Sequence, residues 1–148
     1  MKIKITNLQM LSLIEEQINK GNSITIRVEG NSMLPFIKGG VDYVELSPIT
    51  NQKLKTGDII LFRYSQSFVL HRIISINRET ITTQGDAITK KTESITIQDV
   101  VAITTTIIKK NKRVYTHTTT FRLKSQFWQH LHPVRKLLMK IYIFAKAK

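Results

Sequence analysis

The chain is organised around the stretch EGNSMLP at positions 29–35. The β-branched run ITIRV at positions 24–28 precedes it and predicts a strand that ends at this turn. Gly30 allows backbone angles that residues with a Cβ resist, and Pro35 fixes φ, so the chain turns on both sides of Ser32. A serine held on a tight turn at the end of a strand is exposed and oriented as a nucleophile needs, although most loop serines simply form turns.

Two later stretches supply residues that could act with Ser32. The run FVLHRII at positions 68–74 places His71 among apolar residues, and TQGDA at positions 83–87 places Asp86 in a glycine turn. Serine, histidine and aspartate form the nucleophile, base and orienting group of a hydrolytic triad, which is known in several chain orders. Both later residues also have ordinary structural interpretations, His71 as a core histidine and Asp86 as a turn residue.

Four short motifs, in this order and spacing, resemble those of type I signal peptidases. SMLP at positions 32–35 resembles their Ser-Met-x-Pro box, and GDII at positions 57–60 resembles their Gly-Asp-Ile-Val box. LHRI at positions 70–73 and QGDA at positions 84–87 resemble the His-Arg-Val and Lys-Gly-Asp-Asn boxes of the endoplasmic-reticulum and archaeal branch. Over roughly residues 24–108 the chain is therefore similar to the S24/S26 serine peptidases.

This resemblance implies a serine endopeptidase that cleaves a leader or signal-like peptide. Ser32 would be the nucleophile and His71 the general base, because the neighbouring Arg72 is too strongly protonated to accept a proton. Asp86 would orient His71. The substrate would be an extended peptide or protein segment bound as an added strand, with small residues before the cleaved bond. No metal or cofactor is expected.

The oxyanion and substrate-binding residues are less clearly marked in the sequence. The Ser32 N–H is the natural first oxyanion donor. Signal peptidases often add a hydroxyl two residues before the nucleophile, where this chain has Gly30, so Asn31 is the candidate second donor. Met33 and Pro35 are candidate substrate-binding residues in the wall beside the site.

The alternative to a peptidase is a β domain that keeps the scaffold without catalysis. It would bind peptides, or would use its basic charge to bind a membrane or nucleic acid. Substitution of Ser32 or His71 would then leave its function intact.

Charge divides the chain into two unequal parts. The 148 residues carry a formal net charge of +13, yet all 10 acidic residues and 12 of the 23 Lys and Arg lie in residues 1–108. Residues 109–148 hold 11 cations and no acid. The basic signal therefore belongs to the C-terminal tail. The chain has no cysteine, which excludes disulfides, thiolate metal sites and a cysteine nucleophile.

The pattern of hydrophobic residues predicts a mainly β fold with flanking helices. An amphipathic helix is expected over residues 7–20, with Gly21 as its left-handed cap. Short strands and turns over residues 24–108 predict a coiled antiparallel β fold of the signal peptidase and S24 type. Within these, residues 88–94 are expected to be an irregular connection. One peptidase-like domain is expected over residues 1–114, followed by a basic helical tail over residues 115–148.

The tail is expected to finish a strand over residues 114–121 and to form one or two helices over about residues 125–146. Aromatic and cationic residues there suit a membrane surface, and a helix packed on its own domain explains them equally well. Nucleic acid is the weakest of the three interpretations, since no recognition motif accompanies the charge.

The location of the protein is inferred from features that the sequence lacks. No run of apolar residues is long enough for a spanning helix, and residues 1–20 lack the pattern of a secretory signal. A cytoplasmic protein is expected, with a peripheral place at the inner membrane surface as the other possibility. The sequence indicates no oligomeric state.

Overall fold

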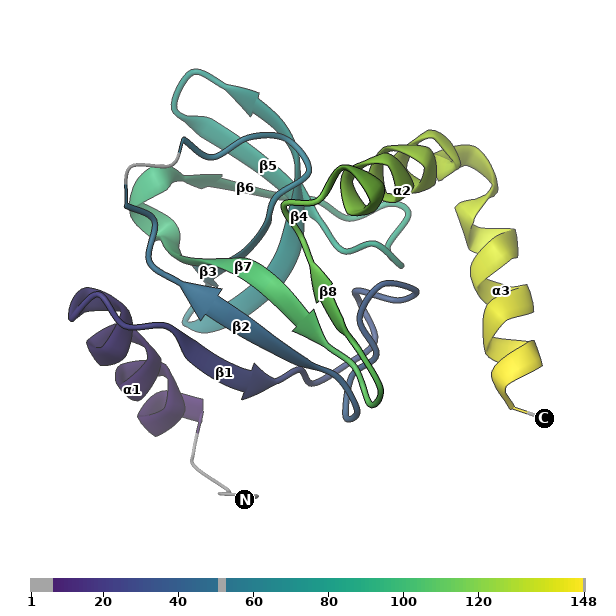
Figure 1. Ribbon diagram of the computed structural model, residues 1–148. Helices are drawn as coiled ribbons and strands as arrows, with labels where there is room; N and C mark the ends of the chain where they lie inside the picture. Colours follow the sequence, from purple (N-terminus) through teal and green to yellow (C-terminus); the bar gives the residue numbers. More distant parts are fainter. Residues whose placement is uncertain (1–6, 51–52, 148) are drawn as a thin grey trace.

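The computed structural model describes residues 7–50 and 53–147, which form a curled antiparallel sheet with helices at both ends of the chain (Figure 1). The strands pair in the order β1-β2-β7-β3-β4-β5-β6, and β8 pairs with β7. The strands are β1 (Ile24–Arg27), β2 (Tyr43–Ser47), β3 (Ile59–Tyr64), β4 (Ser67–Asn77), β5 (Thr80–Gln84), β6 (Glu93–Thr96), β7 (Val100–Ile108) and β8 (Arg113–Tyr115). The helices are α1 (Asn7–Asn19), α2 (Thr119–His130) and α3 (Arg135–Lys146), with short 3-10 turns η1 (Ile97–Asp99) and η2 (His132–Val134). The predicted mainly β class with flanking helices is confirmed.

The sheet curls because its ladders are interrupted by irregularities in register. These occur between Leu61 and Phe62 in β3, between Glu45 and Leu46 in β2, and after Ile73 in β4. A bulge bends its strand and increases the local twist, so β5 and β6 turn over toward the face of β3 and β7 (Figure 1). Two apolar clusters fill the two faces of the sheet, one including Val44 and Leu46 and the other including Phe62 and Ile73.

Helix α1 closes the first cluster, as its amphipathic pattern predicts. Ile14 is 1% exposed and Ile18 is 7% exposed, and both pack against the sheet. The helix ends at Gly21, which has φ +84°. The N–H groups of Gly21 and Asn22 bond back to the carbonyls of Ile18 and Gln17, which is the expected left-handed cap.

The β3–β4 hairpin turns through Ser65 and Gln66, both with positive φ. These signs match a type I′ turn, although the favoured Asn-Gly pair is absent. The hairpin register pairs Ile60 with His71 and Ile59 with Arg72. Successive side chains of β4 therefore point to opposite faces, as predicted.

The structure differs from the sequence predictions in two segments. The stretch expected to be irregular, residues 88–94, contains the start of strand β6, which pairs with β5. Helix α2 begins at Thr119, where a strand was predicted to continue to residue 121. The β-branched run before it favours a strand, but the Thr118 hydroxyl accepts a bond from the Phe121 N–H and caps a helix instead. The predicted boundary between residues 114 and 115 falls inside β8.

Candidate active site

Ser32 lies in the compact turn that follows β1. Gly30 has φ +77°, which only glycine adopts without strain. A Cβ on Gly39 would lie 1.7 Å from the Gly30 carbonyl oxygen, so two segments of the turn touch where no side chain fits. The Ile37 N–H bonds to the Met33 carbonyl, and the Leu34 N–H bonds to the Asn31 carbonyl. These contacts hold Ser32 at the surface of the sheet, half-buried.

His71 brings its imidazole to Ser32 from the middle of β4. Its Nε2 lies 3.1 Å from Ser32 Oγ, within hydrogen-bond distance. The ring is 8% exposed and meets the edge of Phe62, with ring centroids 6.4 Å apart. The structure thus brings together the two residues that the sequence named as nucleophile and base.

The other ring nitrogen of His71 contacts Glu93, the first residue of β6. His71 Nδ1 lies 3.0 Å from Glu93 Oε2, and that oxygen also accepts a bond from the Thr83 hydroxyl at 2.8 Å. Glu93 is 5% exposed. A carboxylate at this position requires a proton on Nδ1, which leaves Nε2 free to accept the Ser32 hydroxyl proton.

Asp86, expected to orient His71, lies elsewhere. Its two oxygens accept from Arg72 Nε and Nη2, both at 2.8 Å, and neither side chain is exposed to solvent. Because Arg72 follows His71 along β4, this ion pair lies on the opposite face of the strand. The expectation is corrected on this point, since Glu93 occupies the position beside His71 that Asp86 was expected to fill.

Sequence reasoning misses Glu93 because the composition of residues 88–94 predicts an irregular connection. The available signal was short: Glu93 and Ile95 are buried in β6 while Ser94 and Thr96 are exposed. Alternation over four residues is weak evidence for a strand. The pairing of Thr83 with Glu93 across β5 and β6 places the carboxylate, and no local pattern indicates that pairing.

Gly85 forms part of the site through the absence of a side chain. A Cβ on it would lie 2.6 Å from the Ser32 carbonyl oxygen and 2.9 Å from His71 Nε2. The adjacent Ala87 N–H donates to the same Ser32 carbonyl at 2.9 Å. The QGDA motif therefore touches the site through Gly85 and Ala87, while Asp86 points away from it.

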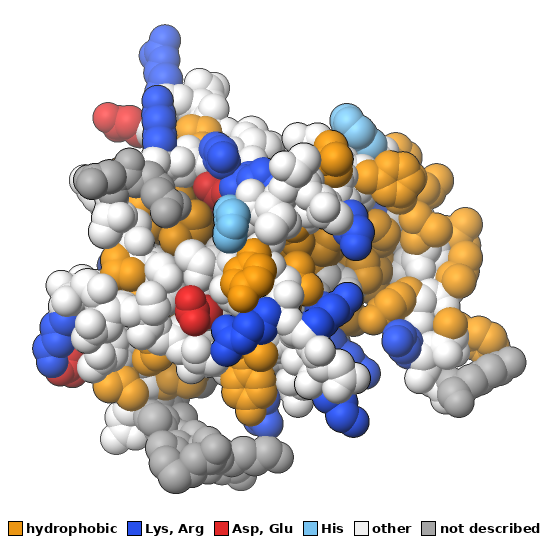
Figure 2. All heavy atoms as spheres, in the orientation of Figure 1, with side chains coloured by type: hydrophobic (Ala, Val, Ile, Leu, Met, Phe, Trp, Pro, Cys, Tyr) orange, Lys and Arg blue, Asp and Glu red, His pale blue; other side chains and the backbone are white. Residues whose placement is uncertain are grey.

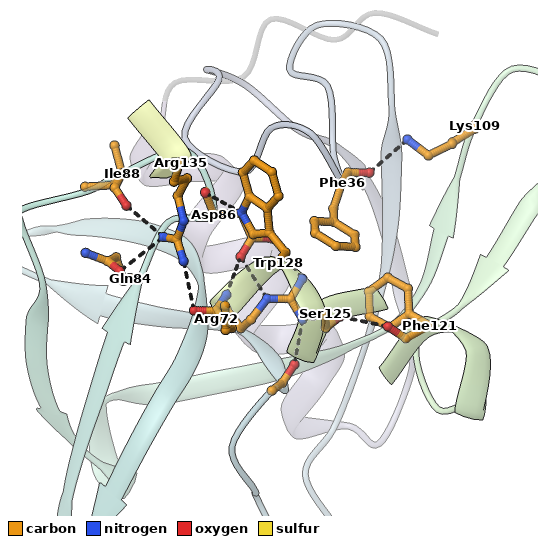
Figure 3. A network of polar contacts seen from close by, with 12 residues as sticks. Phe36, Arg72, Gln84, Asp86, Ile88, Lys109, Phe121, Ser125, Trp128 and Arg135 are labelled. Atoms are coloured by element: carbon orange, nitrogen blue, oxygen red, sulfur yellow. Dashed lines mark hydrogen bonds and ion pairs between the residues drawn. The ribbon is translucent and has the colours of Figure 1, made fainter. Parts of the chain in front are cut away.

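The C-terminal helices bind the segment around Asp86 from the side away from Ser32 and His71 (Figure 3). Trp128 Nε1 donates to the Asp86 carbonyl at 2.7 Å, and Arg72 Nη1 donates to Ser125 Oγ at 2.8 Å. Arg135 Nη1 donates to the Ile88 carbonyl at 2.9 Å. Helices α2 and α3 thus bind the backbone on both sides of Ala87.

Arg135 is itself fully buried in this network. Burial lowers the pKa of Arg135, and nearby Arg72 adds to that effect, whereas the negative charge of Asp86 opposes it. The guanidinium lies over the Trp128 ring at 5.7 Å, and its Nη2 donates to Gln129 at 3.1 Å. The C-terminal helices are therefore anchored by buried charge, with Arg72 paired to Asp86 and Arg135 bonded to the neighbouring Ile88 carbonyl.

An open cleft of about 690 Å³ runs past Ser32, His71 and Glu93. Its apolar walls come from the turn after β1, from β4 and from the segment after Gly85, through Val28, Phe68, Leu70 and Ile88. A separate cavity of about 400 Å³ lies between β4 and α2, beside Arg72, and includes none of the three site residues.

The remaining candidate residues lie around Ser32 in different environments. Met33 is 2% exposed and belongs mainly to the core, although it also borders the cleft. Pro35 follows a cis peptide bond and is not among the residues lining the cleft. The Asn31 side chain is exposed. Asp58, in the GDII motif, accepts bonds from the Lys55 N–H and from Arg122 of α2, a structural role.

Ser32, His71 and Glu93 meet in the order of nucleophile, base and orienting group, an arrangement suited to acyl transfer. Among residues 7–50 and 53–147, no group of three or more His, Cys, Asp or Glu is placed to hold a metal ion. In the same residues no helix has the length and apolar character needed to cross a bilayer.

Comparison of the sequence with protein-family models and with curated proteins finds no match.

Proposed function

We propose that the protein is a serine endopeptidase that cuts a leader or signal-like peptide. The observation that carries the proposal is the chain of contacts from Ser32 Oγ to His71 Nε2 and from His71 Nδ1 to Glu93. Three residues from three distant segments meet in the order that nucleophile, base and orienting group require. The similarity of the SMLP and LHRI motifs to signal peptidases points to the same chemistry.

In the first half of the reaction, Ser32 Oγ attacks the carbonyl carbon of the scissile peptide bond. His71 Nε2 accepts the hydroxyl proton, and buried Glu93 stabilises the imidazolium that forms. Collapse of the tetrahedral intermediate breaks the C–N bond, and His71 gives its proton to the leaving amine. The product is an ester between Ser32 and the N-terminal part of the substrate.

In the second half, water repeats the attack on that ester. His71 accepts a proton from the water, and Ser32 recovers the proton when the acid product leaves. The base must be neutral at the start of both halves, because only a neutral imidazole can accept a proton.

The developing oxyanion requires donors near Ser32. The Ser32 N–H bonds to no other group among the described residues, so it is free to donate to an oxyanion. The exposed amide of Asn31 is the candidate for the second donor, as the sequence suggested. Replacement of Asn31 by Asp would place a negative charge beside that oxyanion.

The substrate is proposed to bind as an extended strand along the cleft. Strand β1 ends the sheet and pairs only with β2 among the described strands, so its outer edge can receive another strand. The cleft is lined by both apolar and polar side chains, and Val28, Phe68 and Leu70 offer apolar contacts to an extended peptide.

The test is labelling of the purified protein with a serine-directed acylating or phosphonylating probe, read by intact mass, together with mass-spectrometric digestion of a peptide library. Wild type should gain one adduct and cut peptides, whereas Ser32→Ala and His71→Ala should do neither. Ser67→Ala is the matched control, because Ser67 borders the same cleft but bonds only to the Tyr64 carbonyl.

Equal labelling and cleavage by wild type and His71→Ala would contradict the proposal. A wild-type protein that binds library peptides, leaves them intact and binds equally well as Ser32→Ala would favour a non-catalytic peptide-binding domain.

A further inference from the structure

The C-terminal helices expose an unusual amount of apolar surface. We use the term exposed apolar face for five of the exposed hydrophobic side chains of α2, η2 and α3, each between 46% and 65% exposed: Leu123, Phe127, Val134, Leu137 and Ile141. Figure 2 shows hydrophobic side chains gathered over these helices, at the right of the view. Contiguous apolar surface of this kind marks a binding site for a protein or a membrane.

Helical periodicity shows that the face is distinct from the side on which the helices pack. The buried residues are Phe121 and Ser125 in α2 and Arg135 and Met139 in α3. Val134, Leu137 and Ile141 recur at spacings of three and four and lie on the other side of α3. A helix packed on its own domain normally turns a polar face to water, so packing alone does not account for these residues.

Positive charge accompanies the exposed apolar face. Lys124, Lys136 and Lys140 are exposed and lie next to it in the sequence of α2 and α3. The whole segment 109–148 has 11 cations and no acidic residue. An anionic lipid bilayer offers both an apolar interior and a negative surface, so it matches both features.

Other occupants match only one of the two features. A second copy of the chain could cover the apolar residues, but it would bring two sets of lysines together without acids between them. A nucleic acid would neutralise the lysines, but it would leave the apolar side chains in water.

We propose that α2 and α3 bind the surface of an anionic membrane, with the exposed apolar face inserted at the boundary between headgroups and acyl chains. Each helix has 12 residues, so it is about 18 Å long and lies in the interface. The cations then contact lipid phosphates. This binding does not depend on the peptidase chemistry, because the exposed apolar face lies away from the side chains of α2 and α3 that bond to Asp86 and Ile88.

The test is flotation of the full chain with vesicles of phosphatidylcholine, with and without phosphatidylglycerol. Wild type should float with the anionic vesicles, and added salt should weaken the binding. Phe127→Gln/Leu137→Gln/Ile141→Gln should lower the partition coefficient by about a hundredfold, since several buried apolar side chains are lost. Lys136→Gln/Lys140→Gln should remove most of the preference for anionic vesicles.

Matched controls distinguish binding by the exposed apolar face from nonspecific hydrophobic binding. Leu13→Gln/Ile97→Gln removes two other exposed apolar side chains, 41% and 52% exposed, and should float as wild type does. Ser32→Ala should also float as wild type does, so a failure of the peptidase proposal leaves this one intact. Circular dichroism checks that each variant is folded. If the triple variant is unfolded, flotation of Lys136→Gln/Lys140→Gln tests the proposal in its place.

Three outcomes of the flotation and oligomer measurements would overturn the proposal. They are absence of wild-type flotation, equal flotation of the wild type with the triple and lysine variants, and a stable dimer that the triple variant dissociates. Tighter binding to duplex DNA than to anionic vesicles would also overturn it, in favour of a nucleic-acid surface.

Discussion

His71 and Arg72 are neighbours in β4, yet they serve two different regions of the molecule. His71 points into an open cleft, where its ring contacts Ser32 and Glu93. Arg72 points to the other face, where it bonds to Asp86 and Ser125 and lies 4.9 Å from the Phe36 ring centroid (Figure 3). One residue builds a candidate reaction centre and the next fastens the C-terminal helices to the sheet.

Gly85 and Asp86 repeat this division in the segment after β5. Gly85 touches Ser32 and His71, whereas Asp86 bonds to Arg72. The LHRI and QGDA motifs therefore each contribute both to the site and to the anchor behind it. The comparison teaches that adjacent motif residues can have separate roles, one chemical and one structural.

The largest expected effect separates the two carboxylates. Glu93→Gln should lower kcat on a cleaved peptide by about a thousandfold, because the amide no longer holds the imidazole in the required tautomer. Asp86→Asn should change kcat by less than about tenfold per folded molecule, since Asp86 does not contact His71. The measurement is steady-state cleavage, with the folded fraction determined by circular dichroism. A larger loss in Asp86→Asn would restore Asp86 as the orienting residue.

The second effect concerns the buried anchor. Arg72→Met should lower the free energy of unfolding by about 3–5 kcal/mol, because it leaves the Asp86 carboxylate buried without its cation. Urea denaturation followed by circular dichroism measures this change. The double variant Arg72→Met/Asp86→Asn should be less destabilised than the sum of the two single variants, since no Asp86 carboxylate is left buried without Arg72. Additive losses would show that the two side chains are not coupled.

The smallest effect concerns the tie between α2 and the segment around Ala87. Trp128→Phe keeps an aromatic ring but removes the bond from Nε1 to the Asp86 carbonyl, which should cost about 1 kcal/mol of stability. The melting temperature should fall slightly, while kcat stays close to wild type. A large drop in kcat without a change in melting temperature would show that α2 positions the reaction centre as well as stabilising it.

Local sequence patterns were sufficient for much of this molecule. The alternation in FVLHRII placed His71 and Arg72 on opposite faces. The turn chemistry around Ser32 indicated the turn after the first strand, although Ser32 is half-buried there and not exposed. The spacing of Leu11, Ile14 and Ile18 placed α1 on the core, where Ile14 and Ile18 are buried. In each case the deciding interaction lies within a few residues of chain.

Non-local features were missed where local preference was weak or misleading. The threonine-rich run before Phe121 favours a strand by composition, but a capping hydroxyl and the burial of Phe121 against the core produce a helix. Strand β6 is only four residues long, so it depends on its pairing with β5 for stability.

The amino-acid sequence alone determines the residue types available for the site, the faces of His71 and Arg72 in β4, and the concentration of positive charge after residue 108. These follow from side-chain period and composition, which are local properties. The choice of Glu93 over Asp86 as the partner of His71 came only from the folded molecule. That choice depends on the register between β5 and β6, which places Glu93 beside His71. It also depends on buried Arg72, which forms an ion pair with Asp86 on the opposite face of β4. Both are contacts between distant segments, which no local pattern specifies.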